Sequence, residues 1–208
     1  MYREYPYESA EANGSHAYLR PAIECALSVL PQGARVLDIG CGNGSLTAAW
    51  AKDGWDVTGV DFSESGIAHA RASHPNIAFH QMPVGPELVE HFGGGCFDAI
   101  VSAEVVEHLY APRDLARNSF RLLRDGGMLI LTTPYHGYVK NLVMAATGTM
   151  DRHWTVLWDG GHIKFWSWKT IGVLLREAGF TGLEFRGVGR VPYLWKSMVV
   201  CANKPKSG

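Results

Sequence analysis

Two carboxylates and an imidazole stand close together in the stretch Glu104-Val105-Val106-Glu107-His108. Spacings of i, i+3 and i+4 place three side chains on one face wherever the chain turns helically. Acidic oxygens beside an imidazole are typical ligands of a divalent cation such as Mg²⁺ or Mn²⁺. The same side chains suit acid–base chemistry, in which His108 takes a proton from a reacting group. The stretch predicts a reactive centre with the metal-bound and metal-free roles both open.

A further histidine, His162, follows Gly160 and Gly161 in the segment 159–166. Glycines let a loop adopt the backbone conformations needed to bring an imidazole back over a cleft. We therefore predict His162 as the ligand that completes a metal site, or, without a cation, His108 or His162 as the general base. The other histidines considered are interpreted as surface or packing residues: His74, His136 and His153.

Three alternate glycines, Gly40, Gly42 and Gly44, follow the apolar run 36–39. Bare backbone permits close approach of a nucleotide-sized molecule, which a side chain would hold away. A second apolar run, 57–60, ends at Asp61. In a parallel sheet that end lies beside the glycine turn, where a carboxylate can accept both hydroxyls of a ribose. The two features together predict one cofactor pocket.

At these residues the chain resembles the class I S-adenosylmethionine-dependent methyltransferases, whose first motif is an acidic residue followed by GxGxG. An acid that the family usually carries after the third strand is absent, and Gln81-Met82-Pro83-Val84 stands there; backbone groups near Met82 to Val84 are the substitute that we consider. The resemblance implies S-adenosylmethionine as the cofactor, bound by Asp38, Gly40, Cys41, Gly42, Asn43, Gly44, Asp61, Phe62, Ser63, Met82 and Glu104.

Three further motifs, Glu104–His108, His162–Phe165 and Leu174–Phe180, resemble the ubiquinone-biosynthesis O-methyltransferases over roughly residues 34–186. The first two also resemble the small-RNA 3′-terminal 2′-O-methyltransferases, in which two glutamates and two histidines hold Mg²⁺. That resemblance implies Glu104, Glu107, His108 and His162 as metal ligands. The E-x-x-E-H pattern also occurs in metal-free relatives, so a histidine base stays an alternative.

Strand-like and helix-like segments alternate along the chain, which indicates an α/β fold. Among them are a helix over 64–73 and the turn Asp125-Gly126-Gly127, which leads into a strand over 128–133. The resemblance implies a Rossmann-like, seven-stranded, mostly parallel sheet with helices on both faces and the last strand antiparallel. We predict a single domain over residues 1–208, with an N-terminal arm and helix in 1–31 and an insertion at 134–161 that caps the acceptor site. Closure of the arm over the site is an alternative to surface packing for Tyr2, Tyr5, Tyr7, His16 and Tyr18.

The composition favours a soluble protein that acts on small molecules. A formal net charge of −1 without a long basic run argues against a broad grip on nucleic acid. Four scattered cysteines without CxxC spacing predict reduced thiols in a cytoplasmic protein. The N-terminus lacks the apolar core of an export signal, and the apolar segment 139–147 is too short to span a bilayer. Peripheral membrane contact and oligomeric state stay open.

The sequence thus predicts an S-adenosylmethionine-dependent methyltransferase that O-methylates a small diol, catechol-like or glycan acceptor, with assistance from Mg²⁺ or Mn²⁺. One alternative is a metal-free methyltransferase with a histidine base, and another is a catalytically silent, cofactor-binding partner subunit. A nicotinamide oxidoreductase is disfavoured by the GxGxG spacing and by the absence of a Tyr-x-x-x-Lys motif.

Overall fold

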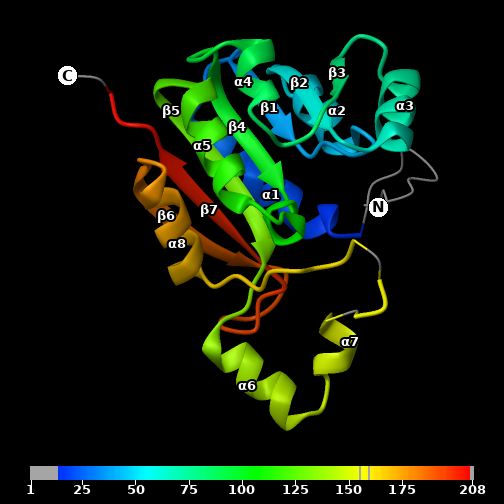
Figure 1. The fold of residues 1–208 in the computed structure, drawn as a ribbon, viewed down its shortest axis with the longest axis vertical. Coiled ribbons are helices and arrows are strands. Elements are labelled where there is room, and N and C mark those ends of the chain that lie inside the picture. Colours follow the sequence, from blue (N-terminus) through cyan, green and yellow to red (C-terminus); the bar gives the residue numbers. More distant parts are fainter. Residues whose placement is uncertain (1–13, 155, 159, 207–208) are drawn as a thin grey trace.

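A computed structural model of the chain describes residues 14–154, 156–158 and 160–206. Strands and helices alternate through most of these residues (Figure 1). In chain order the elements are α1 (His16–Leu27), β1 (Arg35–Ile39), α2 (Ser45–Lys52), β2 (Asp56–Asp61), α3 (Glu64–Ser73), β3 (Ala78–Gln81), α4 (Glu87–Phe92), β4 (Phe97–Ala103), the 3₁₀ turn η1 (Val106–His108), α5 (Pro112–Leu122), β5 (Leu123–Pro134), α6 (Tyr138–Ala146), α7 (Met150–Trp154), α8 (Trp168–Glu177), β6 (Thr181–Val188) and β7 (Ser197–Asn203).

The strands form one seven-stranded sheet in the order β3-β2-β1-β4-β5-β7-β6. Neighbours from β3 to β5 pair in parallel, while β7 pairs antiparallel with both β5 and β6. The predicted fold class, including the reversed last strand, is confirmed. Because strand order reverses direction at β1, the carboxyl ends of β1 and β4 flank the position where ligands bind in open α/β sheets.

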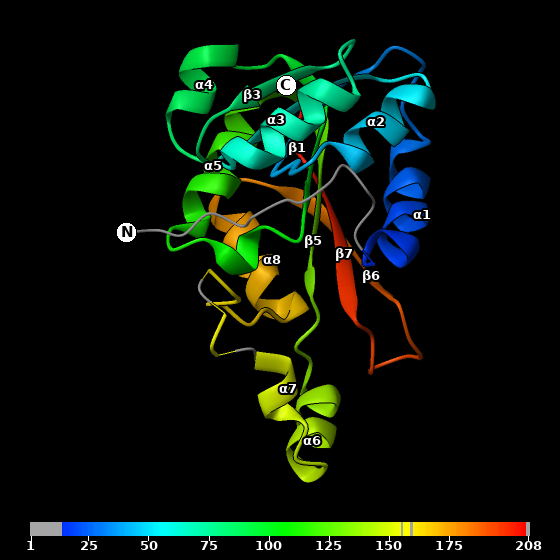
Figure 2. The ribbon, with the colours of Figure 1, turned by 90° about the vertical axis from the view of Figure 1, so that its right-hand side faces the viewer.

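Helices cover both faces of the sheet (Figure 2). On one face, α1 and α2 bury Ile23 and Trp50 completely, in a core with Val36 and Val101. On the opposite face, α4, α5 and α8 pack on a second core. Strands with apolar residues on both sides are what a sheet covered on both faces requires.

Two local predictions differ from the structure. The segment Asp125-Gly126-Gly127, predicted as a turn before a strand, lies within β5, and the β4–β5 pairing shifts register between Phe97 and Ala99. Gly126 adopts a positive φ of 77°, which lets the strand continue past the irregularity. Helices α4 and α7 were not predicted because each spans less than two turns.

The predicted acceptor insertion contains α6 and α7, which project beyond the carboxyl ends of the strands (Figures 1 and 2). The arm residues Tyr2, Tyr5 and Tyr7 lie outside the described residues. Within the described ranges, no helix combines the length and apolar character needed to cross a lipid bilayer.

Candidate active site

The glycine turn between β1 and α2 depends on backbone that only glycine adopts easily. Gly40, Gly42 and Gly44 have φ values of 84°, 53° and 77°. A Cβ atom on Gly40 would meet Val105 Cγ2 at 2.2 Å, and one on Gly44 would meet the Phe79 ring at 2.8 Å. The turn therefore packs against the chain after β4 at a distance that a larger residue would prevent.

Asp61, at the end of β2, is oriented by main-chain donors. Its Oδ2 accepts the Gly42 N–H at 2.8 Å and its Oδ1 accepts the Ser63 N–H at 2.7 Å. These charge-assisted bonds fix the carboxylate beside the glycine turn. The predicted adjacency of the turn and this acid is present in the structure.

Asp38 lies deeper than Asp61 and is only 2% exposed. Its Oδ2 accepts a hydrogen bond from Thr47 Oγ1 at 2.6 Å. Burial raises the pKa of Asp38 to about 7, and the nearby Asp61 adds to this rise, while the Thr47 hydroxyl opposes it. A carboxyl with such a pKa responds strongly to any cation placed beside it.

A cavity of about 650 Å³ lies between the glycine turn and the segment after β4. It is lined by these predicted cofactor residues: Asp38, Gly40, Cys41, Gly42, Asn43, Asp61, Phe62, Ser63 and Glu104. Gly44 and Met82 do not line it. Met82 packs against the core and its N–H donates to the Asp61 carbonyl, while Pro83 and Val84 line the cavity instead.

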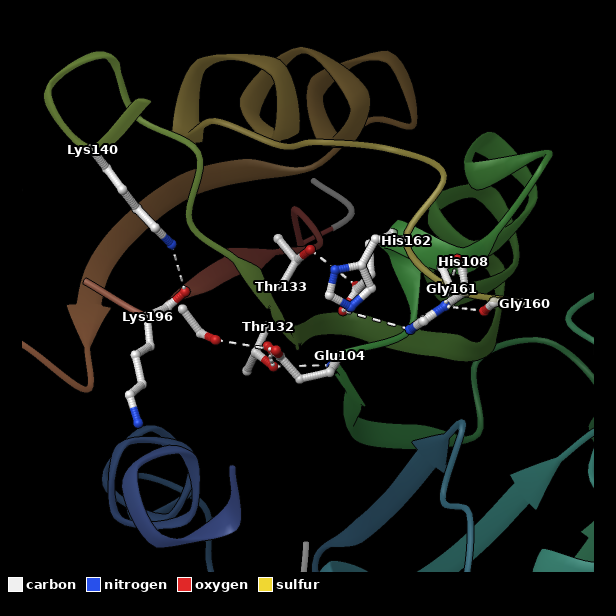
Figure 3. Close-up of polar contacts among 11 residues, drawn as sticks. Glu104, His108, Thr132, Thr133, Lys140, Gly160, Gly161, His162 and Lys196 are labelled. Carbon is white, nitrogen blue, oxygen red and sulfur yellow. Dashed lines mark hydrogen bonds and ion pairs between the residues drawn. The ribbon is translucent and has the colours of Figure 1, made fainter. Parts of the chain in front are cut away.

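Glu104 does not lie where the predicted helical turn would put it. Its φ of 57° is in the left-handed region, and its N–H donates to both the carbonyl and the hydroxyl of Thr132. Its two carboxylate oxygens accept the Thr132 hydroxyl at 2.9 Å and the Ser197 hydroxyl at 3.1 Å (Figure 3). Burial raises the pKa of Glu104 to about 7.

A cluster of potential cation ligands consists of Glu107, His108 and His162, whose ligand atoms all lie within 4.8 Å of one another. Glu104, the fourth predicted ligand, is not part of this cluster, because the turn at Glu104 directs its carboxylate to the hydroxyls of Thr132 and Ser197. The turn η1 is 3₁₀ rather than α-helical, so the i, i+3, i+4 argument fails for Glu104.

Glu107 is 1% exposed, and one of its oxygens lacks a conventional partner. Its Oε2 accepts the Thr133 hydroxyl at 3.0 Å, whereas Oε1 is buried without a hydrogen bond. Oε1 lies 4.0 Å from Nε2 of His108 and 4.0 Å from Nε2 of His162. Burial first, then Glu104, raises the pKa of Glu107 well above its usual value.

The His108 imidazole is held by the loop opposite it (Figure 3). His108 Nδ1 bonds to the Gly160 carbonyl at 2.8 Å and lies 3.2 Å from that of Gly161. A carbonyl only accepts, so Nδ1 carries a hydrogen and the neutral ring presents a lone pair on Nε2. Burial, then His108, lowers the pKa of His162 to about 4, so this ring is neutral near pH 7.

The loop that carries His162 is clipped to Glu107 by main-chain bonds. The N–H groups of Ile163 and Lys164 both donate to the Glu107 carbonyl, at 3.0 and 3.1 Å. The prediction that the glycine-flanked segment returns over the cleft is met by this geometry, and His162 lines the cavity together with His108.

Sequence reasoning missed the hydroxyls of Thr132, Thr133 and Ser197 that bind the two glutamates. Adjacent threonines at the end of a buried strand were the available signal. His16, which was named only as an arm residue, lines the cavity and has Nδ1 3.2 Å from Ser45 Oγ. His136, which was interpreted as a surface or packing residue, is buried, with 7% of its surface exposed.

Comparison with known proteins extends this description. A family model described as "Methyltransferase domain" matches residues 12–184. The ubiquinone biosynthesis O-methyltransferase of Caulobacter sp. (strain K31) is 37% identical over 119 residues, which cover 56% of this chain and 47% of that protein. Its counterpart from Ruegeria sp. (strain TM1040) is 30% identical over 167 residues, covering 79% and 67%. The chain spans about half the length of the first curated relatives it matches.

Among solved structures, phosphoethanolamine N-methyltransferase 2 of Haemonchus contortus, in complex with S-adenosyl-L-methionine, has a TM-score of 0.68 to this chain at 17% identity, covering 90% of this chain and 52% of the other. At that identity the likeness concerns the fold. Because the family model covers most of the chain and the Ruegeria relative is matched over two thirds of its length, the chain belongs to the class I S-adenosylmethionine-dependent methyltransferases.

Proposed function

We propose that this chain transfers the methyl group of S-adenosylmethionine to an oxygen of a small acceptor with two adjacent hydroxyls, of the catechol-like or glycan type. The observation that carries the proposal is the buried, unpartnered Oε1 of Glu107, which faces two imidazole nitrogens at 4.0 Å inside the cavity that holds the glycine turn. The O-methyltransferase names of the curated relatives agree with oxygen as the accepting atom.

The cofactor end of the cavity suits S-adenosylmethionine. Asp61 is oriented for a ribose, and Phe62 is 51% exposed at the cavity lining, where its ring can cover an adenine. The backbone of Gly40 and Gly42 allows close approach of the methionine portion. Asp38, with its raised pKa, lies where the ammonium of that portion would favour the carboxylate form.

The acceptor end suits a divalent cation held by Glu107, His108 and His162. A cation there would satisfy Oε1 of Glu107. His108 has its Nδ1 hydrogen on the Gly160 carbonyl and so offers Nε2 as the ligand atom, and His162 is neutral because its pKa is lowered. When bound, such an ion lowers the pKa of a hydroxyl that it contacts. The residues themselves fix the direction from which the acceptor oxygen meets the cofactor, and proximity supplies part of the rate.

A metal-free version of the reaction rests on the same geometry. His162 is half-buried at the cavity lining and neutral near pH 7, so it can accept a proton from an acceptor hydroxyl in the cavity. A pKa of about 4 makes it a weak base, which suits an acidic phenol better than a sugar alcohol. A catalytically silent subunit is the third reading, and a complete acceptor cluster beside the cofactor turn argues against it.

The test combines turnover with a direct measurement of metal binding. Purified protein is incubated with S-adenosylmethionine and a panel of catechols and vicinal sugar diols, and demethylated cofactor is quantified. We expect catechol turnover that stops with EDTA and returns with Mg²⁺ or Mn²⁺. Mn²⁺ binding, followed by electron paramagnetic resonance, should be lost in Glu107→Gln and His162→Ala and kept in Glu90→Gln, an exposed control on α4.

The outcomes separate the readings. Turnover that resists EDTA, with one of the two histidines essential, supports the metal-free base. Cofactor binding without turnover of any acceptor, in a protein that activates another subunit, supports the silent partner. Equal binding of NAD and S-adenosylmethionine would overturn the assignment of the cofactor end.

A further inference from the structure

A buried ammonium group lies outside the cofactor and acceptor cluster, at the start of α6. Lys140 is 5% exposed, and its Nζ donates to the Lys196 carbonyl at 3.3 Å (Figure 3). In the described part of the chain, no carboxylate lies within salt-bridge distance of this ammonium. A buried charge is costly unless it is paired, and the Lys140 ammonium has one neutral acceptor and no counterion among the residues that the structure describes.

Two imidazoles beside Lys140 also have unmet hydrogen-bonding capacity. Nε2 of His136 and Nε2 of His153 are both buried without a partner. The two ring centroids lie 5.1 Å apart, and His136 as a whole is 7% exposed. Orphaned buried polar atoms are rare in folded proteins and generally indicate a missing ligand or water.

The charges around this group are almost all positive. Lys140 lowers the pKa of both His136 and His153, after burial as the main cause, and Arg190 also lowers the pKa of His153. Burial and Arg190 lower the pKa of Lys140 to about 8. Glu104 favours the Lys140 ammonium, and its carboxylate already accepts two hydroxyls.

The amino end of α6 adds main-chain donors to the same place. Its N-cap is Gly137, which offers no side-chain acceptor, and its first turn contains no acidic residue. Helix amino ends carry partial positive charge and free N–H groups. The segment 136–153 therefore carries a buried ammonium, two imidazoles with unpartnered Nε2 atoms and a helix amino end whose first turn has no acidic residue.

This group is close to the acceptor end of the cavity. The His136 N–H donates to the Trp166 carbonyl at 2.9 Å, and the His136 ring lies 5.0 Å from the Phe165 ring. The group is therefore in contact with the loop that carries His162, and His162 lines the cavity.

We propose that the acceptor carries an anionic group, a carboxylate or a phosphate, which binds between Lys140, His136 and His153 at the amino end of α6. This inference rests on the proposed function, because it assigns the second end of the same acceptor. The anion would accept from Lys140 Nζ and from the imidazole Nε2 atoms in their NH form, which satisfies three polar atoms that the free protein leaves unmet or weakly bound.

Direct binding tests the subsite without turnover. Benzoate, phenyl phosphate and inorganic phosphate are titrated into the protein and followed by histidine ring signals in NMR spectra. We expect binding that shifts the His136 and His153 signals and weakens about tenfold or more in Lys140→Met, the scale of a lost charge-assisted hydrogen bond. Lys169→Met, on the exposed first turn of α8, should bind as the unchanged protein does. The preferred probe distinguishes a carboxylate from a phosphate.

Turnover supplies the second arm. The kcat/KM for 3,4-dihydroxybenzoate should be about tenfold higher than that for catechol. This ratio should fall toward one in Lys140→Met, and Lys140→Arg should restore part of it. If Lys140→Met is misfolded by circular dichroism, His153→Phe replaces it. The inference is overturned if none of the probes binds. It is also overturned if the variants change neither probe binding nor the ratio of kcat/KM between the two acceptors. Probe binding without methylation of either diol keeps the anion subsite and instead contradicts the proposed function.

Discussion

Asp61 accepts two main-chain N–H groups while its carboxylate lines the cavity, so its position is set before any ligand arrives. Replacing it by alanine should weaken S-adenosylmethionine binding by about 1.5 to 3 kcal/mol, since a charge-assisted hydrogen bond is lost. Calorimetry checks this value. Asp56→Ala, at the exposed start of the same strand, is the matched control and should bind normally. Equal losses in both variants would assign the effect to the strand rather than to the carboxylate.

Asp38 makes the stability of the free protein depend on pH. Its folded-state pKa of about 7 lies above the ordinary value of 3.8, so folding favours its protonated form. The stability that this provides is fully present below the unfolded value and is lost as pH rises through the folded value. The free-energy difference of unfolding between wild type and Asp38→Asn should therefore shift against wild type by a few kcal/mol from about pH 4 to about pH 8.

Urea unfolding at several pH values measures this difference. The Thr47→Val variant removes the hydroxyl that donates to Asp38. Because this hydroxyl opposes the rise in the Asp38 pKa, its loss should raise that pKa further. A difference that does not vary with pH would mean that Asp38 titrates normally in the folded protein.

Residue types alone predicted much of the cofactor pocket, because glycines and acids at strand ends have few structural alternatives. They did not show that Glu104 and Glu107 have different surroundings. Glu104 accepts the hydroxyls of Thr132 and Ser197, and Glu107 accepts the hydroxyl of Thr133; these three residues lie on β5 and β7, far along the chain. Local spacing contains no information on which strand lies beside which glutamate.

At the scale of elements, periodicity predicted the long helices, and α3 begins and ends at the predicted residues, Glu64 and Ser73. The stretch 104–108 was harder to predict. Its residues tolerate an α-helix, yet the N–H of Glu104 bonds to Thr132 on the neighbouring strand, which continues the sheet pattern and forces a left-handed residue before η1. A tertiary hydrogen bond thus overrides the local preference.

The loop after α7 places Trp158 at the cavity lining, with its ring 5.7 Å from that of His108 and 5.9 Å from that of His162. Trp158→Ala should raise the acceptor KM several-fold, because a ring contact of roughly 1 kcal/mol is lost, and should leave S-adenosylmethionine affinity nearly unchanged. Leu157→Ala is the neighbouring control, since that side chain is 95% exposed. Steady-state kinetics with each substrate varied separates the two effects, and a loss of cofactor affinity in Trp158→Ala would contradict the assignment.

At the scale of the whole molecule, α1 is an integral part of the core on one face of the sheet. Ile23 is fully buried there, and α1 also brings Ser15, His16 and Leu19 to the cavity. Sequence periodicity predicted this helix but not its contribution to the site, because the cavity is lined by segments that are far apart in the sequence, such as 15–19 and 158–162.

Ile23→Ala should lower the free energy of unfolding by about 2 to 4 kcal/mol, the range for emptying a packed core position. Val29→Ala, whose side chain is 75% exposed, should change it by less than about 0.5 kcal/mol. Chemical denaturation monitored by tryptophan fluorescence measures both. A small effect at Ile23 would mean that α1 docks loosely and that the remainder folds without it.

The clip between the Glu107 carbonyl and the N–H groups of Ile163 and Lys164 has a consequence for how such enzymes diversify. The segment between β5 and α8 carries Trp158, which lines the cavity and which we propose to contact the acceptor, and also the imidazole of His162. A related protein that exchanged this segment would acquire a new specificity and a new reactive group in one recombination event, provided that the two N–H groups still reached the same carbonyl. Acceptor selectivity and the reactive histidine would then change together, while the cofactor-binding turn would stay the same.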